Sequence, residues 1–369
     1  MPGTTTFASD RLTRLRARMG DTGTDLVALG PTSHMRWLAG LDPHGDERPV
    51  MLLVGPDHAG VLMPALNANA ARQETDLPFE TWDDATGPDA ALVRLLDAVS
   101  ARGPGLSVQI DEAMRADFAL LLLDALDTPR RGFARNTVGH LRARKEPGEI
   151  EALIASARLN DEAMQAGFEA LREGITEREV QEVIQAKYAL RGARPEFTIV
   201  GFGANGAFPH HHTGETCLER EMAVLIDTGC RIGGYPSDMT RCGWFGGDPS
   251  AEFCKVADIL EGAVQAALNA ARPGVRASTV DAAAREHIAA AGYGDQFLHR
   301  LGHGLGVDVH EPPYLTATSD TVLDEGMVFS IEPGIYLDGQ FGVRLEDIVV
   351  LRADGPEILS AMSRDIVIR

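Results

Sequence analysis

The chain has 369 residues, of which 44% are hydrophobic, enough for two domains with sizeable cores and too apolar for a disordered chain. Its formal net charge of -20 repels the phosphates of nucleic acids and anionic lipids, so we expect neither nucleic acid nor a membrane as a partner. The cysteines form no C-x-x-C pair and predict free thiols; they are Cys217, Cys230, Cys242 and Cys254. Residues 1–20 lack the apolar core of a signal peptide, so we expect a cytoplasmic protein.

The first third of the chain alternates helical and strand patterns. Residues 9–20 begin with Ser and Asp and end with Gly, which is typical of a capped helix. Helical periodicity also covers residues 87–103 and 111–129. Short apolar runs bounded by Gly, Pro or Asp predict buried strands at residues 25–30, 50–55 and 60–66. These elements predict an α/β domain over residues 1–135, followed by a polar, basic connection.

The remainder, residues 136–369, shows a pattern that occurs twice. Helices are predicted at residues 147–172 and 176–191, the second opened by Thr-Glu-Arg-Glu, a capping box. Strand-like segments follow, and then two more helices, at residues 249–271 and 278–291, again followed by strands. We therefore predict an α+β fold in which two duplicated halves, each with two helices and antiparallel strands, enclose one site.

Four carboxylates stand inside or at the end of apolar, strand-like runs: Asp227, Asp238, Glu332 and Glu346. An unpaired buried carboxylate costs several kcal/mol or is neutralised by a shift in its pKa. One such residue is often a strand cap or half of an ion pair. Two in each half, with only Arg241 and Arg344 as obvious basic partners, favour bound cations instead.

The spacing of these carboxylates supports a shared site. Asp227 and Asp238 are eleven residues apart, and Glu332 and Glu346 fourteen apart, each pair across a turn rich in Gly, so each pair can lie on one hairpin. Four carboxylates and one imidazole are enough ligands for two divalent cations around a shared water, and they balance the charge of those cations. An oxygen-rich set favours Mn²⁺ or Co²⁺ over a structural zinc.

The imidazole is expected from residues 299–313, which contain His299, His303 and His310. Three interspersed glycines make a continuous helix unfavourable, at roughly 1 kcal/mol each, and they let the backbone approach a crowded centre. An irregular segment indicates divided labour, with one imidazole binding metal and the other two facing the substrate.

A second histidine cluster, residues 210–212, follows Pro209 in a loop before the Asp227 strand. A run of three histidines is often an incidental exposed feature. Its place in the chain also allows one of them to line the site, and the roles of His211 and His212 stay open.

Five motifs in order carry a resemblance to a known family: PHH, DTGCRIGGYPSDMTR, GHGLGVDVHE, EPGIY and VRLED. They resemble the pita-bread metallopeptidases, and within these the proline-specific Xaa-Pro dipeptidases and Xaa-Pro aminopeptidases. The resemblance covers roughly residues 140–360, and the first 135 residues are similar to the N-terminal domain of that branch only in outline. It implies a C-terminal pita-bread catalytic domain, a smaller N-terminal α/β domain and a homodimer.

The resemblance also implies a ligand set for two metal ions. Asp227 would hold one ion, Asp238 and Glu346 would bridge both, and His303 and Glu332 would complete the other. We expect Mn²⁺, with Co²⁺ or Zn²⁺ as alternatives.

The remaining site residues are assigned to substrate and chemistry. His210 would face the substrate, His299 would line the proline pocket, and His310 would steady the tetrahedral intermediate. Arg344 would lie near the bridging glutamate and contact the substrate. The catalytic set implied is therefore His210, His310, Glu332 and Arg344. One departure from the family pattern is Cys242, where Thr is common; it lies beyond the ligands.

This site predicts hydrolysis of the bond before proline in Xaa-Pro dipeptides or short peptides. A metal-bridging hydroxide would attack the carbonyl, Glu332 would shuttle the proton, and His310 would stabilise the oxyanion. Peptidases that bond the scissile N–H fail on this bond because proline has none.

Four alternatives remain. A proline-specific carboxypeptidase can use the same metal centre. The complete ligand set disfavours an inactive binding protein and a metal-independent, creatinase-type amidinohydrolase, and the N-terminal domain disfavours a methionine aminopeptidase. We expect residues 33–49 to help decide which end of the peptide is read.

Overall fold

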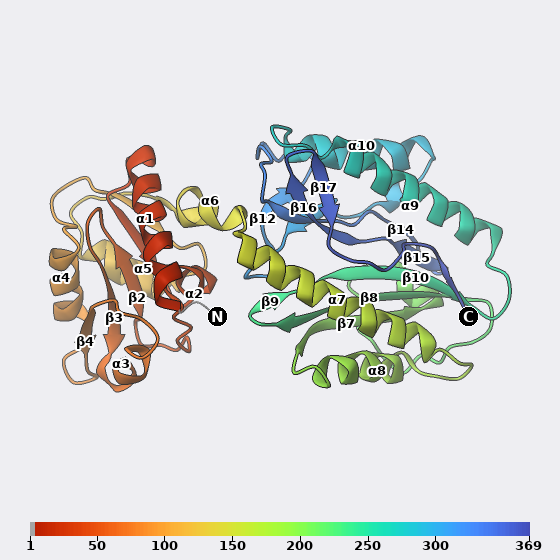
Figure 1. Cartoon of the computed structure of the whole chain (residues 1–369), viewed down its shortest axis with the longest axis horizontal. Helices are drawn as coiled ribbons and strands as arrows, with labels where there is room; N and C mark the ends of the chain where they lie inside the picture. The colour runs from red at the N-terminus through yellow and green to blue at the C-terminus, as the bar shows by residue number, and fades with distance from the viewer. Residues whose placement is uncertain (1–3) are drawn as a thin grey trace. The chain divides into compact units, whose positions relative to one another are not determined.

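A computed structural model describes residues 4–369, and the chain divides into two compact units (Figure 1), the first ending at Arg142 and the second spanning Ala143–Arg369. The boundary expected after residue 135 lies before the observed one, because residues 136–142 stay with the first unit. These residues include the end of a 3-10 turn, Ala134–Asn136, and all but the last residue of helix α6 (Val138–Ala143). Within the first unit, Arg142 donates to the hydroxyl of Ser33 at 2.9 Å.

The first unit is built on a six-stranded mixed sheet with strand order β4-β3-β2-β1-β5-β6. The strands are β1 (Leu26–Leu29), β2 (Met51–Val54), β3 (Ala59–Pro64), β4 (Phe79–Trp82), β5 (Ser107–Ile110) and β6 (Arg130–Phe133). The neighbours of β2 pair with it in antiparallel fashion and the other pairs are parallel. The strands predicted from apolar runs are β1, β2 and β3, and all three are confirmed.

Helices of the first unit precede or connect these strands. They are α1 (Thr4–Thr22), α2 (Ser33–Ala39), α3 (Ala65–Ala71), α4 (Asp89–Ala98) and α5 (Ala116–Asp124). The three predicted helices are present as α1, α4 and α5. The predicted cap at Ser9 and Asp10 is wrong, because α1 already begins at Thr4. Leu95 and Leu96 of α4 and Phe118 and Leu122 of α5 pack on the sheet in one buried cluster.

The second unit contains the predicted duplication. Its first half has α7 (Pro147–Glu169) and α8 (Glu177–Ala189), followed by β7 (Arg194–Phe202), β8 (Met222–Ile232), β9 (Tyr235–Pro236) and β10 (Met239–Phe245). These strands form an antiparallel sheet to which β18 (Val367–Ile368) adds in parallel. The predicted capping box is confirmed, since Thr176 accepts from the Glu179 amide at 3.1 Å and Glu179 accepts from the Thr176 amide at 2.8 Å.

The second half repeats this arrangement. Helices α9 (Ala251–Ala270) and α10 (Ala277–Ala290) precede a sheet of order β12-β11-β13-β16-β17. Its strands are β11 (Gly302–Gly304), β12 (Glu311–Leu315), β13 (Val328–Ile331), β16 (Asp347–Arg352) and β17 (Gly355–Ile358). A hairpin of β14 (Gly334–Leu337) and β15 (Phe341–Arg344) lies between β13 and β16 in the chain.

Each half buries its helices against its strands. Phe168 and Tyr188 of α7 and α8 pack with Ile226 of β8, whereas Phe253 of α9 packs in a second cluster with Phe329 of β13. Figure 1 shows the two helix pairs, green and teal, with the strands between them. The predicted α+β fold is therefore confirmed. Among residues 4–369, no helix combines the length and the apolar character needed to cross a bilayer.

Candidate metal centre

Three of the four singled-out carboxylates lie at breaks between strands. Asp238 lies between β9 and β10, Glu332 between β13 and β14, and Glu346 between β15 and β16, while Asp227 lies within β8. The expectation that Glu332 and Glu346 share one hairpin is wrong. They follow β13 and precede β16, which pair through Ile331 and Asp347, and the β14–β15 hairpin is inserted between them. The paired strands nevertheless bring the two glutamates to one place.

The five predicted metal ligands form one cluster. The side chains of Asp227, Asp238 and Glu346 bring ligand atoms within 4.8 Å of one another, and so do those of His303, Glu332 and Glu346. His303 Nε2 lies 3.2 Å from Glu332 and 3.7 Å from Asp238. Glu346 belongs to both groups of three, so its carboxylate connects them. The structure thus brings both pairs of carboxylates and one imidazole to a common centre.

The electrostatics of this cluster call for added positive charge. Burial, together with the neighbouring carboxylates, raises the pKa of Asp238 and of Glu346 well above the usual range, and burial also raises that of Asp227. Burial opposes ionisation of Glu332 too, but the hydrogen bond and charge of His303 lower its pKa to about 2. Carboxylates crowded in this way are stabilised in their charged form by cations.

Asp227 provides a direct test of whether a cation fits. One of its oxygens accepts from Arg344 at 2.6 Å. The other, Oδ1, is buried and has no hydrogen-bond partner among the residues that the structure describes. Buried carboxylate oxygens are ordinarily satisfied, so an oxygen open toward a cluster of ligands fits a metal-binding role. The donor set, carboxylates with one imidazole, suits hard divalent cations.

Two hydroxyl residues that the sequence reasoning did not single out organise the cluster. Thr240 donates to Glu346 at 2.7 Å and accepts from Arg344 Nε at 2.9 Å. Arg344 also donates to the Tyr336 hydroxyl at 2.8 Å. Both residues lie inside the quoted motifs, but a neutral hydroxyl in a strand creates no charge anomaly. Arg344 therefore connects Asp227, Thr240 and Tyr336 through one planar guanidinium.

These contacts determine the state of His299. Because Arg344 can only donate, the Tyr336 hydroxyl accepts from it and directs its own proton to His299 Nε2, 2.8 Å away. The proton on the His299 ring then lies on Nδ1, which is 2.8 Å from the Arg300 carbonyl. Burial lowers the pKa of His299. The ring is therefore a neutral imidazole with both nitrogens occupied and a fixed orientation.

All nine predicted site residues line one cavity of about 490 Å³. They are His210, Asp227, Asp238, His299, His303, His310, Glu332, Arg344 and Glu346. His310 lies with its ring centroid 4.2 Å from that of His303, and burial followed by the charge of His303 lowers the pKa of His310 to about 4. Phe197, Ile199 and Val309 add apolar surface to the lining. The lining of the cavity thus combines charged and imidazole side chains with apolar ones.

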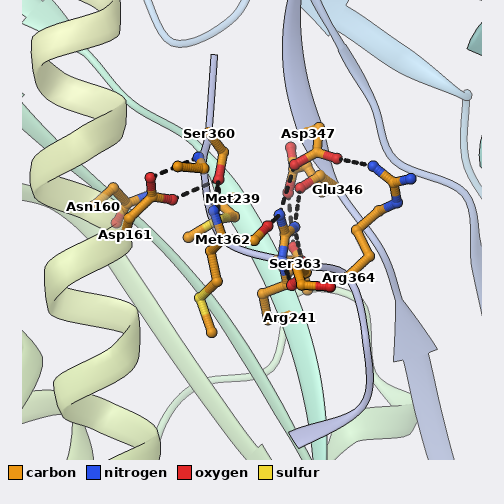
Figure 2. A network of polar contacts seen from close by, with 12 residues as sticks. Asn160, Asp161, Met239, Arg241, Glu346, Asp347, Ser360, Met362, Ser363 and Arg364 are labelled. Atoms are coloured by element: carbon orange, nitrogen blue, oxygen red, sulfur yellow. Dashed lines mark hydrogen bonds and ion pairs between the residues drawn. The ribbon is translucent and has the colours of Figure 1, made fainter. Parts of the chain in front are cut away.

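Arg241 has a different role from the one expected. It does not pair with the clustered carboxylates. Instead its fully buried guanidinium donates to the Asp347 carboxylate at 2.7 Å, to the Glu346 carbonyl at 2.6 Å and to carbonyls of the C-terminal segment (Figure 2). Arg364 donates to the other oxygen of Asp347 at 2.6 Å. This network holds the backbone on which Glu346 stands.

Comparison with known proteins agrees with this geometry. The model of metallopeptidase family M24 matches residues 151–353, and that of the creatinase/prolidase N-terminal domain matches residues 11–130. The chain is 33% identical to a Xaa-Pro dipeptidase of Lactobacillus delbrueckii subsp. lactis, over 96% of this chain and 98% of that protein.

Two solved structures are similar over nearly the whole chain. The dipeptidase PepE from Mycobacterium ulcerans has a TM-score of 0.93 at 32% identity, over 98% of both chains. A prolidase from Thermococcus sibiricus has a TM-score of 0.88 at 33% identity, over 97% of this chain and 98% of that one. Since the family model covers more than half of the chain and the similarity to a curated relative extends over nearly all of it, the chain belongs to metallopeptidase family M24.

Proposed function

We propose that this protein hydrolyses the peptide bond before proline in Xaa-Pro dipeptides or short Xaa-Pro peptides, with two divalent metal ions. The observation that carries the proposal is one cavity lined by the five clustered residues, three further histidines and two arginines. Similar proteins named Xaa-Pro dipeptidase and prolidase support the choice of proline.

The chain's own residues determine where the ions would be held. Asp238 and Glu346, which both neighbour Asp227, would lie between two ions, with Asp227 on one side and His303 and Glu332 on the other. When bound, such ions supply positive charge at the scissile carbonyl and lower the pKa of a shared water. The oxygen-rich donor set favours Mn²⁺, with Co²⁺ or Zn²⁺ as alternatives.

The remaining steps are performed by side chains in the cavity. Glu332 lies beside His303 in the cluster, and its carboxylate can accept a proton from the attacking water. It can then return that proton to the imino nitrogen of proline, which must be protonated to leave. His310, neutral because its pKa is about 4, can donate a hydrogen bond to the oxyanion that develops. His299, whose two ring nitrogens are both hydrogen-bonded, presents a ring of fixed orientation to the substrate.

The proposal is tested by assaying Ala-Pro, Ala-Pro-Ala and Ala-Ala-Pro before and after complete metal removal by a chelator. We expect hydrolysis of Ala-Pro to disappear on removal and to return with Mn²⁺. Ala-Ala is the matched control and should be a much poorer substrate. Full activity after metal removal would contradict the proposal. Cleavage of Ala-Pro-Ala indicates an aminopeptidase, and release of proline from Ala-Ala-Pro indicates a carboxypeptidase.

A further inference from the structure

A fully buried carboxylate outside the candidate metal centre forms hydrogen bonds with several residues of the loop that carries His210. Glu177, the first residue of α8, has a buried side chain. Its Oε1 accepts from the Phe202 amide at 2.9 Å and from the side chain of Asn205 at 2.8 Å. Its Oε2 accepts from the Gly214 amide at 3.0 Å and lies 2.9 Å from His211 Nε2. One carboxylate therefore holds both ends and the middle of residues 202–214.

The His211 contact reaches the turn that presents His210. The His211 amide donates to the Phe208 carbonyl at 3.0 Å, which closes a β-turn with Pro209 and His210 at its centre. Proline is favoured in the first central position of such turns because its φ is preset. The Pro209 carbonyl lies 3.4 Å from Arg344. His210 thus stands at the corner of a turn that is held at its last residue.

The contact between His211 and Glu177 occupies one ring nitrogen of His211. The Glu177 oxygens already accept from three other N–H groups, so His211 Nε2 is the donor in its contact with Glu177. That ring nitrogen is therefore not available to a metal ion or a substrate. His211 also does not line the cavity, whereas its neighbour His210 does. The next residue, His212, is exposed and outside the lining.

We propose that Glu177 and His211 are positioning residues that set the place of the His210 imidazole in the cavity. The inference rests on the proposed function, because it assumes that His210 contacts the substrate. Glu177 fixes the position of His211, and His211, as the last residue of the turn, fixes the position of the adjacent His210. Neither Glu177 nor His211 touches the reacting atoms.

The test compares kcat and KM for Ala-Pro, with metal content and Tm, in His211→Ala, His211→Gln, His212→Ala, His210→Ala and the His210→Ala/His211→Ala double variant. We expect His211→Ala to lower kcat/KM about tenfold or more, because small misplacements of a contacting group cost that much, and to retain full metal content. His211→Gln keeps an N–H donor and should recover most of the loss. His212→Ala, the matched control, should behave like the wild type.

The double variant separates positioning from a merely structural role. If His211 acts through His210, adding His211→Ala to His210→Ala should lower kcat/KM little further. An equal loss in both backgrounds would overturn the proposal, and so would a His210→Ala variant as active as the wild type. Neither outcome affects the metal-dependent hydrolysis of Ala-Pro by the wild type, which tests the proposed function separately. Should His211→Ala fail to fold, His211→Phe keeps the ring volume without the donor and serves the same comparison.

Discussion

Arg344 donates to Asp227 at 2.6 Å, and both side chains are buried among the acidic residues of the site. The same guanidinium reaches Thr240 and Tyr336. A planar group with several donors in a fixed geometry is needed for these three contacts.

We therefore expect Arg344→Lys, which keeps the charge, to lower kcat/KM or metal affinity by about 10–100-fold, the usual cost of losing a group that orients metal ligands. Steady-state kinetics with Ala-Pro and metal titration measure this. Arg352→Lys, on an exposed pair with Glu357, is the matched control. Activity at the wild-type level in Arg344→Lys would show that charge alone suffices.

Asp238 and His310 should respond differently to alanine. Asp238 lies with Asp227 and Glu346 at the centre of the cluster, and His310 lies near enough to Asp238 and His303 to be a candidate ligand itself. We expect Asp238→Ala to lose metal and activity together. His310→Ala should keep its metal and lose about 10²–10³-fold in kcat, as when an oxyanion donor is removed. Elemental analysis and kinetics distinguish the two, and an empty site in His310→Ala would make His310 a ligand.

A buried ion pair supports the segment that carries His310. Lys145 Nζ lies 2.8 Å from Glu311, with side chains 1% and 5% exposed. Removing the cation alone should be costly, because the Glu311 charge stays buried without Lys145. We expect Lys145→Met to lower the free energy of unfolding by about 3–5 kcal/mol. Lys145→Met/Glu311→Gln removes the charge as well and should restore part of that loss. Urea unfolding measures both, and a double variant no more stable than Lys145→Met would contradict this account.

The contact between Glu261 and Arg364 predicts a pH dependence of stability. Arg364 donates to both oxygens of Glu261, at 2.7 and 2.8 Å, and this hydrogen bonding lowers the pKa of Glu261 below its usual value. A carboxyl with a lowered pKa in the folded state stabilises the protein above its unfolded pKa, roughly 4.3, and loses that contribution as the pH falls through the folded pKa.

We expect Glu261→Gln to be less stable than the wild type at pH 7 and the difference to shrink below about pH 4. Urea unfolding of both proteins at a series of pH values measures it. A difference that stays constant down to the acid limit would mean that the charge of Glu261 contributes nothing.

The long elements and the cluster of buried carboxylates could be predicted because their signals are local. Helices α7 to α10 have clear periodicity over many residues, and the Thr176–Glu179 box lies within four residues. The four carboxylates stood out because charge is costly in an apolar run. Short elements such as α2, α3 and β4 were missed because, unlike the equally short β1 and β2, they contain no continuous apolar run of four residues.

By itself, the sequence determined the fold class and the members of the acidic cluster, because periodicity and misplaced charge are properties of neighbouring residues. Which basic group serves which carboxylate was decided only by the tertiary structure. The charge pattern alone did not distinguish Arg241 from Arg344, and only the family resemblance favoured Arg344. In the structure Arg344 reaches Asp227, while Arg241 pairs with Asp347. His211, likewise, pairs with Glu177 from another element. Such pairings depend on side-chain direction across packed elements, and the spacing of residues along a single chain does not contain that direction.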